Sequence, residues 1–174
     1  MHPPMTIAVL ATALAGLACS PTLDWRELRP EDSGIAALFP CKPDRHARKV
    51  VVAGHALRME MLVCSAGGST YALAFADLPD PAAVAPVLAE LRALAITNIA
   101  AAPASAASLQ VPGMTPNPQA ARIALTGRLP DGAAVQEQAA FFARGMRVYQ
   151  ASVVGARLAG DAADTFLAAL KLPG

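Results

Sequence analysis

Apolar and polar positions alternate in one segment of the first half of the chain, and this alternation predicts a β-strand. In the segment that follows His55, the apolar side chains of Leu57, Met59, Met61 and Val63 occupy every second position. Arg58 and Glu60 separate them, and a period of two is typical of a strand with one buried face. The preceding residues form a second strand of the same hairpin, with a turn at residues 53–54. The first strand of the domain is predicted at residues 34–39.

The segment 69–77, STYALAFAD, has two different faces. Tyr71, Leu73 and Phe75 share one face of the predicted strand, and the alanines at positions 72, 74 and 76 line the other face. Small side chains on a strand allow a helix to approach closely. The sequence therefore predicts a helix on the alanine face.

A helix is predicted from Asp80 onwards. Asp80 is a favourable N-cap, and Pro81 suits the first helical position. Apolar residues then recur at helical spacing and form one stripe. They are Val84, Val87, Leu88, Leu91, Leu94 and Ala95. Because Pro86 removes a backbone hydrogen bond, either the helix kinks there or its regular part begins near it.

Residues 100–118 are rich in Ala, Ser and Pro and are predicted to be mostly loop. Three further strands are predicted at residues 122–128, 134–143 and 146–154. A last helix is predicted with Asp161 as its cap and Asp164 in its first turn. Its apolar side, which faces the sheet, consists of Ala163, Phe166, Leu167 and Leu170.

Residues 5–18, MTIAVLATALAGLA, contain no charged side chain. The stretch is too short to span a bilayer comfortably, but its length suits the apolar part of a secretion signal. A buried core helix is the alternative. The stretch is apolar on all sides and is followed by polar, Pro-containing sequence, so the pattern favours export.

The apolar stretch ends in Gly16, Leu17, Ala18 and Cys19, which resembles a bacterial lipobox, where small residues precede an acylated cysteine. Ordinary signal peptidase cleavage is the alternative, because Gly16 and Ala18 are also small in the positions that this enzyme requires. Lipidation of Cys19 predicts a protein on the periplasmic side of the envelope. Ser20, rather than Asp, follows the cysteine and indicates the outer membrane; a soluble periplasmic or secreted protein is the alternative.

These elements predict an α+β fold: a single antiparallel sheet with a central and a C-terminal helix packed on it. A signal or anchor segment precedes the sheet. The predicted division of the chain is a signal at residues 1–19, a tether and lead-in at 20–33, and one domain at 34–174.

Three cysteines are an odd number for an exported protein. Lipidation of Cys19 leaves Cys41 and Cys64 as a pair, which an oxidising compartment would close. If Val52 lies opposite His55, the extrapolated strand register brings Cys41 within two residues of the position opposite Cys64. The sequence therefore predicts a Cys41–Cys64 disulfide, with two unlinked buried thiols as the alternative.

Composition and spacing narrow the function classes. The 174 residues are 55% hydrophobic and 16% charged, with a net charge of +1 and no basic block, so no nucleic-acid partner is expected. His2, His46 and His55 lack metal-binding spacing, and the glycine pairs lack the context of a phosphate loop. No metal, cofactor or catalytic residue is predicted. Glu60 and Glu137 are expected to be surface charges rather than acids or bases of catalysis.

One polar surface is a candidate site. It consists of side chains that share strand faces in pairs: Arg58 with Glu60, Gln136 with Gln138, and Arg147 with Tyr149. If these strands are neighbours, the six side chains form a patch on a sheet face that no helix covers. Ordinary hydration of an exposed face is the alternative.

Several short stretches of the chain are similar to exported bacterial proteins with the PsbP-like α/β fold. The matching residues are Phe39-Pro40 with Pro43, residues 71–81, Arg147 with Tyr149, and Phe166 with Leu170, Lys171 and Leu172. The resemblance covers most of the mature chain. It implies a fold that serves mainly as a binding or assembly module, with no shared catalytic residues.

The leading functional hypothesis is therefore a lipid-anchored binding or accessory module of the bacterial envelope, with an envelope protein or a small ligand as its partner. An envelope hydrolase with an unfamiliar site and a purely structural lipoprotein are the alternatives. A deep apolar cavity under the first helix would favour a small ligand. A flat apolar patch would favour a protein partner, and a pocket with neighbouring titratable groups would favour an enzyme.

Overall fold

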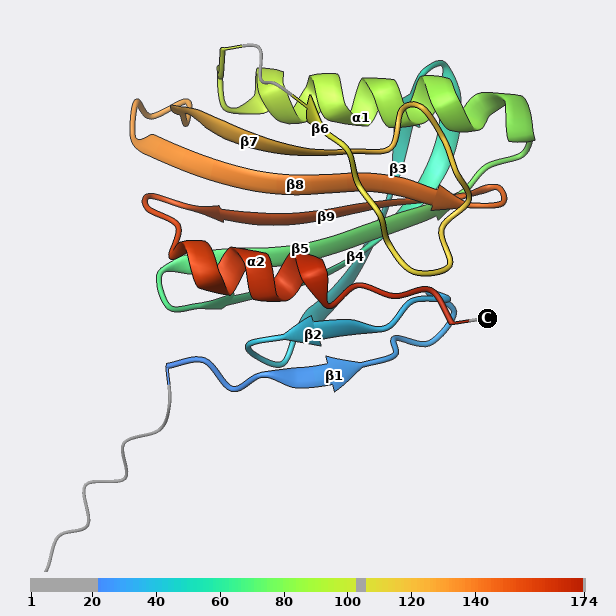
Figure 1. Cartoon of the computed structure of the whole chain (residues 1–174). Coiled ribbons are helices and arrows are strands. Elements are labelled where there is room, and N and C mark those ends of the chain that lie inside the picture. Colours follow the sequence, from blue (N-terminus) through green and yellow to red (C-terminus); the bar gives the residue numbers. More distant parts are fainter. Residues whose placement is uncertain (1–21, 103–105, 174) are drawn as a thin grey trace, which may run out of the picture.

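A seven-stranded antiparallel sheet forms the centre of the structure, a computed structural model that describes residues 22–102 and 106–173 (Figure 1). Its strands lie in the order β3-β4-β5-β9-β8-β7-β6. Their bounds are Asp44–Val52 for β3, His55–Ala66 for β4, Ser69–Asp77 for β5, Ala106–Ala107 for β6, Ala121–Arg128 for β7, Ala134–Arg144 for β8 and Arg147–Gly155 for β9. Two helices, α1 (Val84–Asn98) and α2 (Gly160–Ala168), pack on this sheet, as the sequence predicts.

The prediction of a single sheet is wrong in one respect, because β1 (Arg26–Leu28) and β2 (Ala37–Phe39) form a separate antiparallel pair. The strand β2 occupies the end of the predicted strand at residues 34–39. The strand β1 lies in the segment expected to be a tether and lead-in. Strands of three residues are too short to show an alternation that sequence reasoning can recognise. The predicted signal and Cys19 lie outside the described residues.

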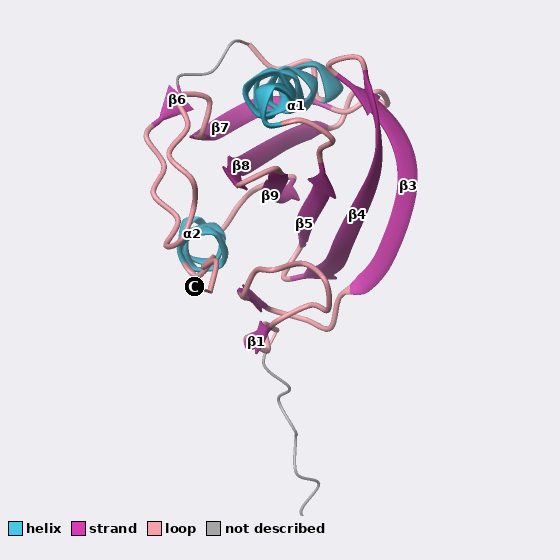
Figure 2. Ribbon diagram, turned by 90° about the vertical axis from the view of Figure 1, so that its right-hand side faces the viewer, coloured by secondary structure: helices cyan, strands magenta, loops and turns pink. Residues whose placement is uncertain are grey.

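The sheet is strongly curled, and its two faces are covered differently (Figure 2). Helix α1 lies in the concave face, with β3 and β4 rising beside it, whereas α2 and the β1–β2 pair lie on the convex side. Alanines 74 and 76 belong to the core beneath α1, and Tyr71, Leu73 and Phe75 belong to the core beneath α2. The two faces predicted for the segment 69–77 are therefore confirmed.

The predicted hairpin register is confirmed as well. Val52 lies opposite His55, and Cys41 and Cys64 form a disulfide with a Cα–Cα distance of 6.0 Å. This distance falls within the range that a disulfide can bridge without backbone movement. The bond fastens the connection between β2 and β3 to the end of β4, the second strand of the sheet.

The two helices begin differently from each other. Asp80 caps a 3₁₀ turn, Pro81–Ala83, by accepting a hydrogen bond from the backbone N–H of Ala82 at 2.8 Å. Helix α1 then begins at Val84, so Pro86 lies in its first turn and breaks no interior hydrogen bond. The prediction that Asp161 caps α2 is wrong, because the helix already begins at Gly160, and its N-cap residue makes no side-chain hydrogen bond.

Candidate ligand-binding groove

An open groove with a volume of about 440 Å³ lies on the concave face, between α1 and the strands β3 and β4. Its floor consists of small or short side chains from the two central strands, Ala72 and Ala74 on β5 and Ser152 on β9. In the sheet Ala72 lies directly opposite Ser152, so the floor is one continuous row. The alanines on this face of β5 have two effects. At one end of the strand they let α1 approach closely, and at the other end they leave the space of the groove.

The walls of the groove are apolar. Met59 and Met61 of β4 form one side, and Leu91 and Leu94 of α1 form the other. Methionine side chains are flexible and adapt to ligands of different shapes. The volume and the mainly apolar lining are those of a small-molecule site rather than of a packing defect.

A hydrogen bond holds the wall of the groove in place. The backbone N–H of Ala53, at the tip of the β3–β4 hairpin, donates to Oε2 of Glu90 on α1 at 2.9 Å. Ala53 has a positive φ of 49°, which a non-glycine residue adopts only in a tight turn. The contact ties the tip of the hairpin to the middle of α1, so β3 cannot lie flat with the rest of the sheet.

One exposed apolar side chain borders the groove. Leu94 is 39% exposed and belongs to the groove lining, whereas the exposed side chain of Val51 lies on the same face of β3 as Lys49. Leu94 is part of the apolar stripe that predicted helix α1, but no neighbour in the described structure covers it fully. The apolar stripe of α1 includes Leu94, which the sheet does not cover. This extra apolar position is the one sequence signal that could have indicated the groove.

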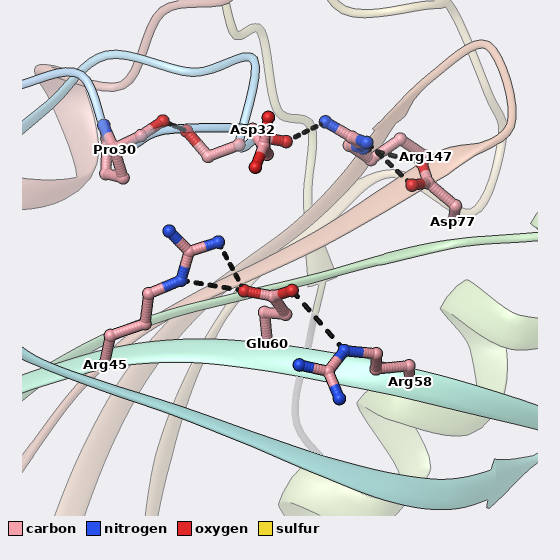
Figure 3. A network of polar contacts seen from close by, with 8 residues as sticks. Pro30, Asp32, Arg45, Arg58, Glu60, Asp77 and Arg147 are labelled. Atoms are coloured by element: carbon pink, nitrogen blue, oxygen red, sulfur yellow. Dashed lines mark hydrogen bonds and ion pairs between the residues drawn. The ribbon is translucent and has the colours of Figure 1, made fainter.

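The predicted polar surface does not form one patch. Arg58 and Glu60 lie on β4 at the same end of the convex face as Arg147 on β9 (Figure 3). Gln136 and Gln138 lie on β8 at the opposite end. Gln136 pairs with Gly155, eight residues from Arg147 along β9, which corresponds to about 27 Å at the rise of a strand.

Glu60 and its two arginines form the first half of the polar network in Figure 3. Oε2 of Glu60 accepts from Arg45 at 2.8 and 2.5 Å, and its Oε1 lies 3.6 Å from Nε of Arg58. The hydrogen bond from Arg45 holds the pKa of this carboxyl below its usual value. Glu60 is therefore an ion-paired surface residue.

Arg147 forms the second half and joins three parts of the chain. It binds both carboxylate oxygens of Asp77 at 2.6 Å, and it donates to the backbone oxygen of Asp32. This pairing lowers the pKa of Asp77. Because both carboxylates of the network are held ionised by arginines, neither is suited to proton transfer near neutral pH.

Tyr149 is buried, with 1% of its surface exposed, and is not part of a polar surface. Its hydroxyl donates to the backbone oxygen of Ser33 at 2.8 Å, and its ring stacks on Phe142 at a centroid distance of 5.1 Å. Arg147 and Tyr149 thus both fasten the loop between β1 and β2 to the sheet. The Arg-x-Tyr pattern has a structural explanation.

The two glutamines also serve the framework. Oε1 of Gln136 accepts from the backbone N–H of Leu158 at 3.0 Å, just before α2. Gln138 accepts from Arg122, which also pairs with Asp164 of α2. These contacts attach α2 to β7 and β8.

Glu137 contradicts the expectation of a surface charge. It lies on the concave face between Leu125 of β7 and Val154 of β9, and only 6% of its surface is exposed. Burial raises its pKa to about 7. The sequence did not predict that Glu137 is buried. Its burial depends on the elements that pack over this part of the sheet, and the residues next to Glu137 in the sequence give no sign of them.

No group of three or more potential metal ligands occurs within residues 22–102 and 106–173. In those same two ranges, no helix is long and apolar enough to cross a bilayer. No protein-family model matches the chain, and no curated protein matches it. The groove is therefore the feature of the described structure that bears most directly on function.

Proposed function

We propose that this protein is an exported binding module that holds a small apolar ligand in the concave groove. A lipid on Cys19 would keep it on the periplasmic side of the envelope, at the outer membrane. The observation that supports ligand binding is the groove itself, which combines an apolar lining, a floor of small residues and a volume of about 440 Å³. The resemblance to PsbP-like proteins, which implies a binding module, is part of the same proposal.

The polar network offers less support for an enzyme. The pocket beside it contains titratable side chains at hydrogen-bonding distance, among them Glu60, Asp77 and Arg147. Each carboxylate is engaged by arginine, and the network joins β3, β4, β5 and the β1–β2 loop. We propose that this cluster stabilises the fold.

Binding of a neutral fluorescent probe, N-phenyl-1-naphthylamine, tests the groove. The protein should enhance the fluorescence of the probe in a saturable manner. Ala72→Trp fills the groove floor and should abolish this enhancement, whereas Ala134→Trp adds the same bulk at an exposed position on β8 and should leave it unchanged. Leu94→Gln, at the exposed edge of the wall, should weaken it without a steric clash.

Loss of the fluorescence in Ala72→Trp alone, with unchanged thermal unfolding, supports the groove as the site. Saturable binding that all variants retain would exclude it. Absence of binding in the unaltered protein would favour the purely structural lipoprotein.

The anchor is tested separately from the ligand. Mass spectrometry of the mature N-terminus should find Cys19 as the first residue, carrying acyl chains. Cys19→Ala should release the protein from the membrane fraction or leave the unprocessed precursor there. An unmodified Cys19, or a mature chain that begins elsewhere, would reduce the proposal to a soluble exported binding protein.

A further inference from the structure

Among the described residues that line the groove, Arg48 of β3 is the one Lys, Arg, Asp or Glu side chain, and it lies at the rim beside His46 of the same strand. The amides of Asn98 and Gln150 complete the polar part of the lining. The rim therefore offers hydrogen-bond donors and positive charge next to an apolar cavity.

Arg48 makes no ion pair with another residue in the described ranges 22–102 and 106–173. Seven ion pairs occur within the described part of the chain, and neither Arg48 nor His46 takes part in any of them. By contrast, six arginines form ion pairs with carboxylates on other strands, on a helix or nearby in the chain: Arg26, Arg29, Arg45, Arg58, Arg122 and Arg147. A guanidinium at the edge of an apolar groove is available to an external anion.

Protection of the sheet edge does not explain this arrangement. The strand β3 is an edge strand, and charged side chains on edge strands prevent pairing between molecules. Successive side chains of a strand point to opposite faces. Arg45 and Lys49 lie on the other face of β3 and protect the edge without lining the groove, whereas Arg48 and His46 line it.

We infer that the groove binds a single-chain lipid with an anionic head group, an inference that rests on the proposed function. The acyl chain would lie along Met59, Met61 and Leu91 above the alanine floor. The head group, a carboxylate or a phosphate, would lie at Arg48 and His46, where charge-assisted hydrogen bonds are the strongest that a side chain can offer. A neutral lipid of the same length would gain the apolar contacts and lose those at the rim.

Titration of the mature protein with four lipids of the same chain tests the inference: oleate, oleoyl lysophosphatidate, oleyl alcohol and oleylamine, each below the concentration at which it forms micelles. Oleate or the lysophosphatidate should bind about tenfold more tightly than oleyl alcohol, the difference expected for one charge-assisted contact. Oleylamine should bind most weakly. The better of the two anions identifies the head group.

Variants of β3 separate the specific contact from overall charge. Arg48→Gln should weaken binding of the anionic lipid about tenfold and leave oleyl alcohol unchanged, and Arg48→Lys should restore part of the affinity. Lys49→Gln removes the same charge from the opposite face of the same strand and should change neither affinity. Equal effects of Arg48→Gln and Lys49→Gln would overturn the assignment of Arg48.

The inference and the proposed function fail in different ways. Equal affinities for oleate, lysophosphatidate and oleyl alcohol would refute the anionic head group and leave the groove as an apolar site. If no lipid binds and N-phenyl-1-naphthylamine does not bind either, the proposed function is wrong as well.

Discussion

The two faces of the central sheet differ in how completely they are covered. Seven of the eight aromatic side chains belong to the convex side, and only Phe141 belongs to the concave core. On the convex side aromatic rings from β5, β8, β9, β2 and α2 contact one another, as in the pairs Phe39–Phe166 and Phe142–Tyr149. On the concave side α1 contributes only aliphatic side chains to the core.

This difference follows from the chain path. After β5 the chain crosses the concave face as α1 and continues to β7 near the other edge of the sheet. A single helix covers only part of a seven-stranded sheet, and β3 and β4 curl up beside it (Figure 2). They contact α1 at the tip of their hairpin, where Ala53 donates to Glu90, and the groove of about 440 Å³ lies between these strands and the helix. The convex face is a closed core that fixes the fold, and the uncovered part of the concave face is available for binding.

The largest expected effect is in the convex core. Phe142→Ala removes a ring that is fully buried and stacked on Tyr149, so the free energy of unfolding should fall by about 3–5 kcal/mol. Leu94→Ala, at the exposed wall of the groove, should cost about 0.5 kcal/mol or less. Urea unfolding measures the loss of unfolding free energy in both variants. Similar losses would contradict the difference between the two faces.

The disulfide tests the convex side in another way. Cys41 and Cys64 both pack against the convex core, and their bond closes a loop of 23 residues. Replacing both by alanine should lower the free energy of unfolding by roughly 3 kcal/mol. Affinity for the groove probe should remain unchanged, because the bond lies on the other face. A parallel loss of affinity would show that the faces are coupled.

Glu137 makes the concave face sensitive to pH. Its pKa is about 7 in the folded protein, compared with an ordinary value of 4.5, so folding favours the protonated form. The stability that the neutral carboxyl contributes is fully present below pH 4.5 and is lost as the pH rises through about 7. The loss should amount to about 3 kcal/mol at pH 8.

Glu137→Gln should remove most of this dependence, as measured by unfolding at pH 5 and pH 8. Glu60→Gln is the matched control on the other face. The pKa of Glu60 is lowered, so its stabilising contribution is present at both of these pH values and is lost only on acidification. If Glu137→Gln left the difference between pH 5 and pH 8 unchanged, Glu137 would not be buried as described.

The smallest effect is expected at the loop between β1 and β2. Tyr149→Phe removes the hydrogen bond to the backbone oxygen of Ser33 and retains the ring, so the free energy of unfolding should fall by about 1 kcal/mol. Hydrogen exchange of residues 30–36 should become faster, while exchange in α1 should not. An unchanged exchange rate in the loop would mean that Arg147 alone holds it in place.

Local pattern predicted most of the framework. The alternation at residues 57–61 and the two faces of the segment 69–77 follow from a period of two, and the Val52–His55 register follows from the turn between them. Beyond Met61 the buried face changes, because Leu62 rather than Val63 belongs to a core. The same register predicted the Cys41–Cys64 bond. These features depend on neighbours in sequence or on one hairpin, and such signals are visible in a single chain.

The features that sequence reasoning missed depend on which elements cover each part of the sheet in the folded protein. Glu137 is buried because α1 lies over its part of the sheet, and Leu94 is exposed because the curled β3 and β4 do not reach it. The polar residues that were grouped into one candidate surface lie at opposite ends of the sheet. Which strands are neighbours, and how strongly the sheet curls, cannot be derived from the alternation within each strand.

An NMR titration of the ¹⁵N-labelled mature protein with oleate tests the central claim, that the uncovered concave face binds a ligand. Backbone signals of Met61, Ala74, Leu91 and Ser152 should shift together and reach saturation, because these residues line the groove. The signal of Phe142, in the closed convex core, should remain in place. Saturable shifts confined to the convex face, or no shifts at all, would contradict the account.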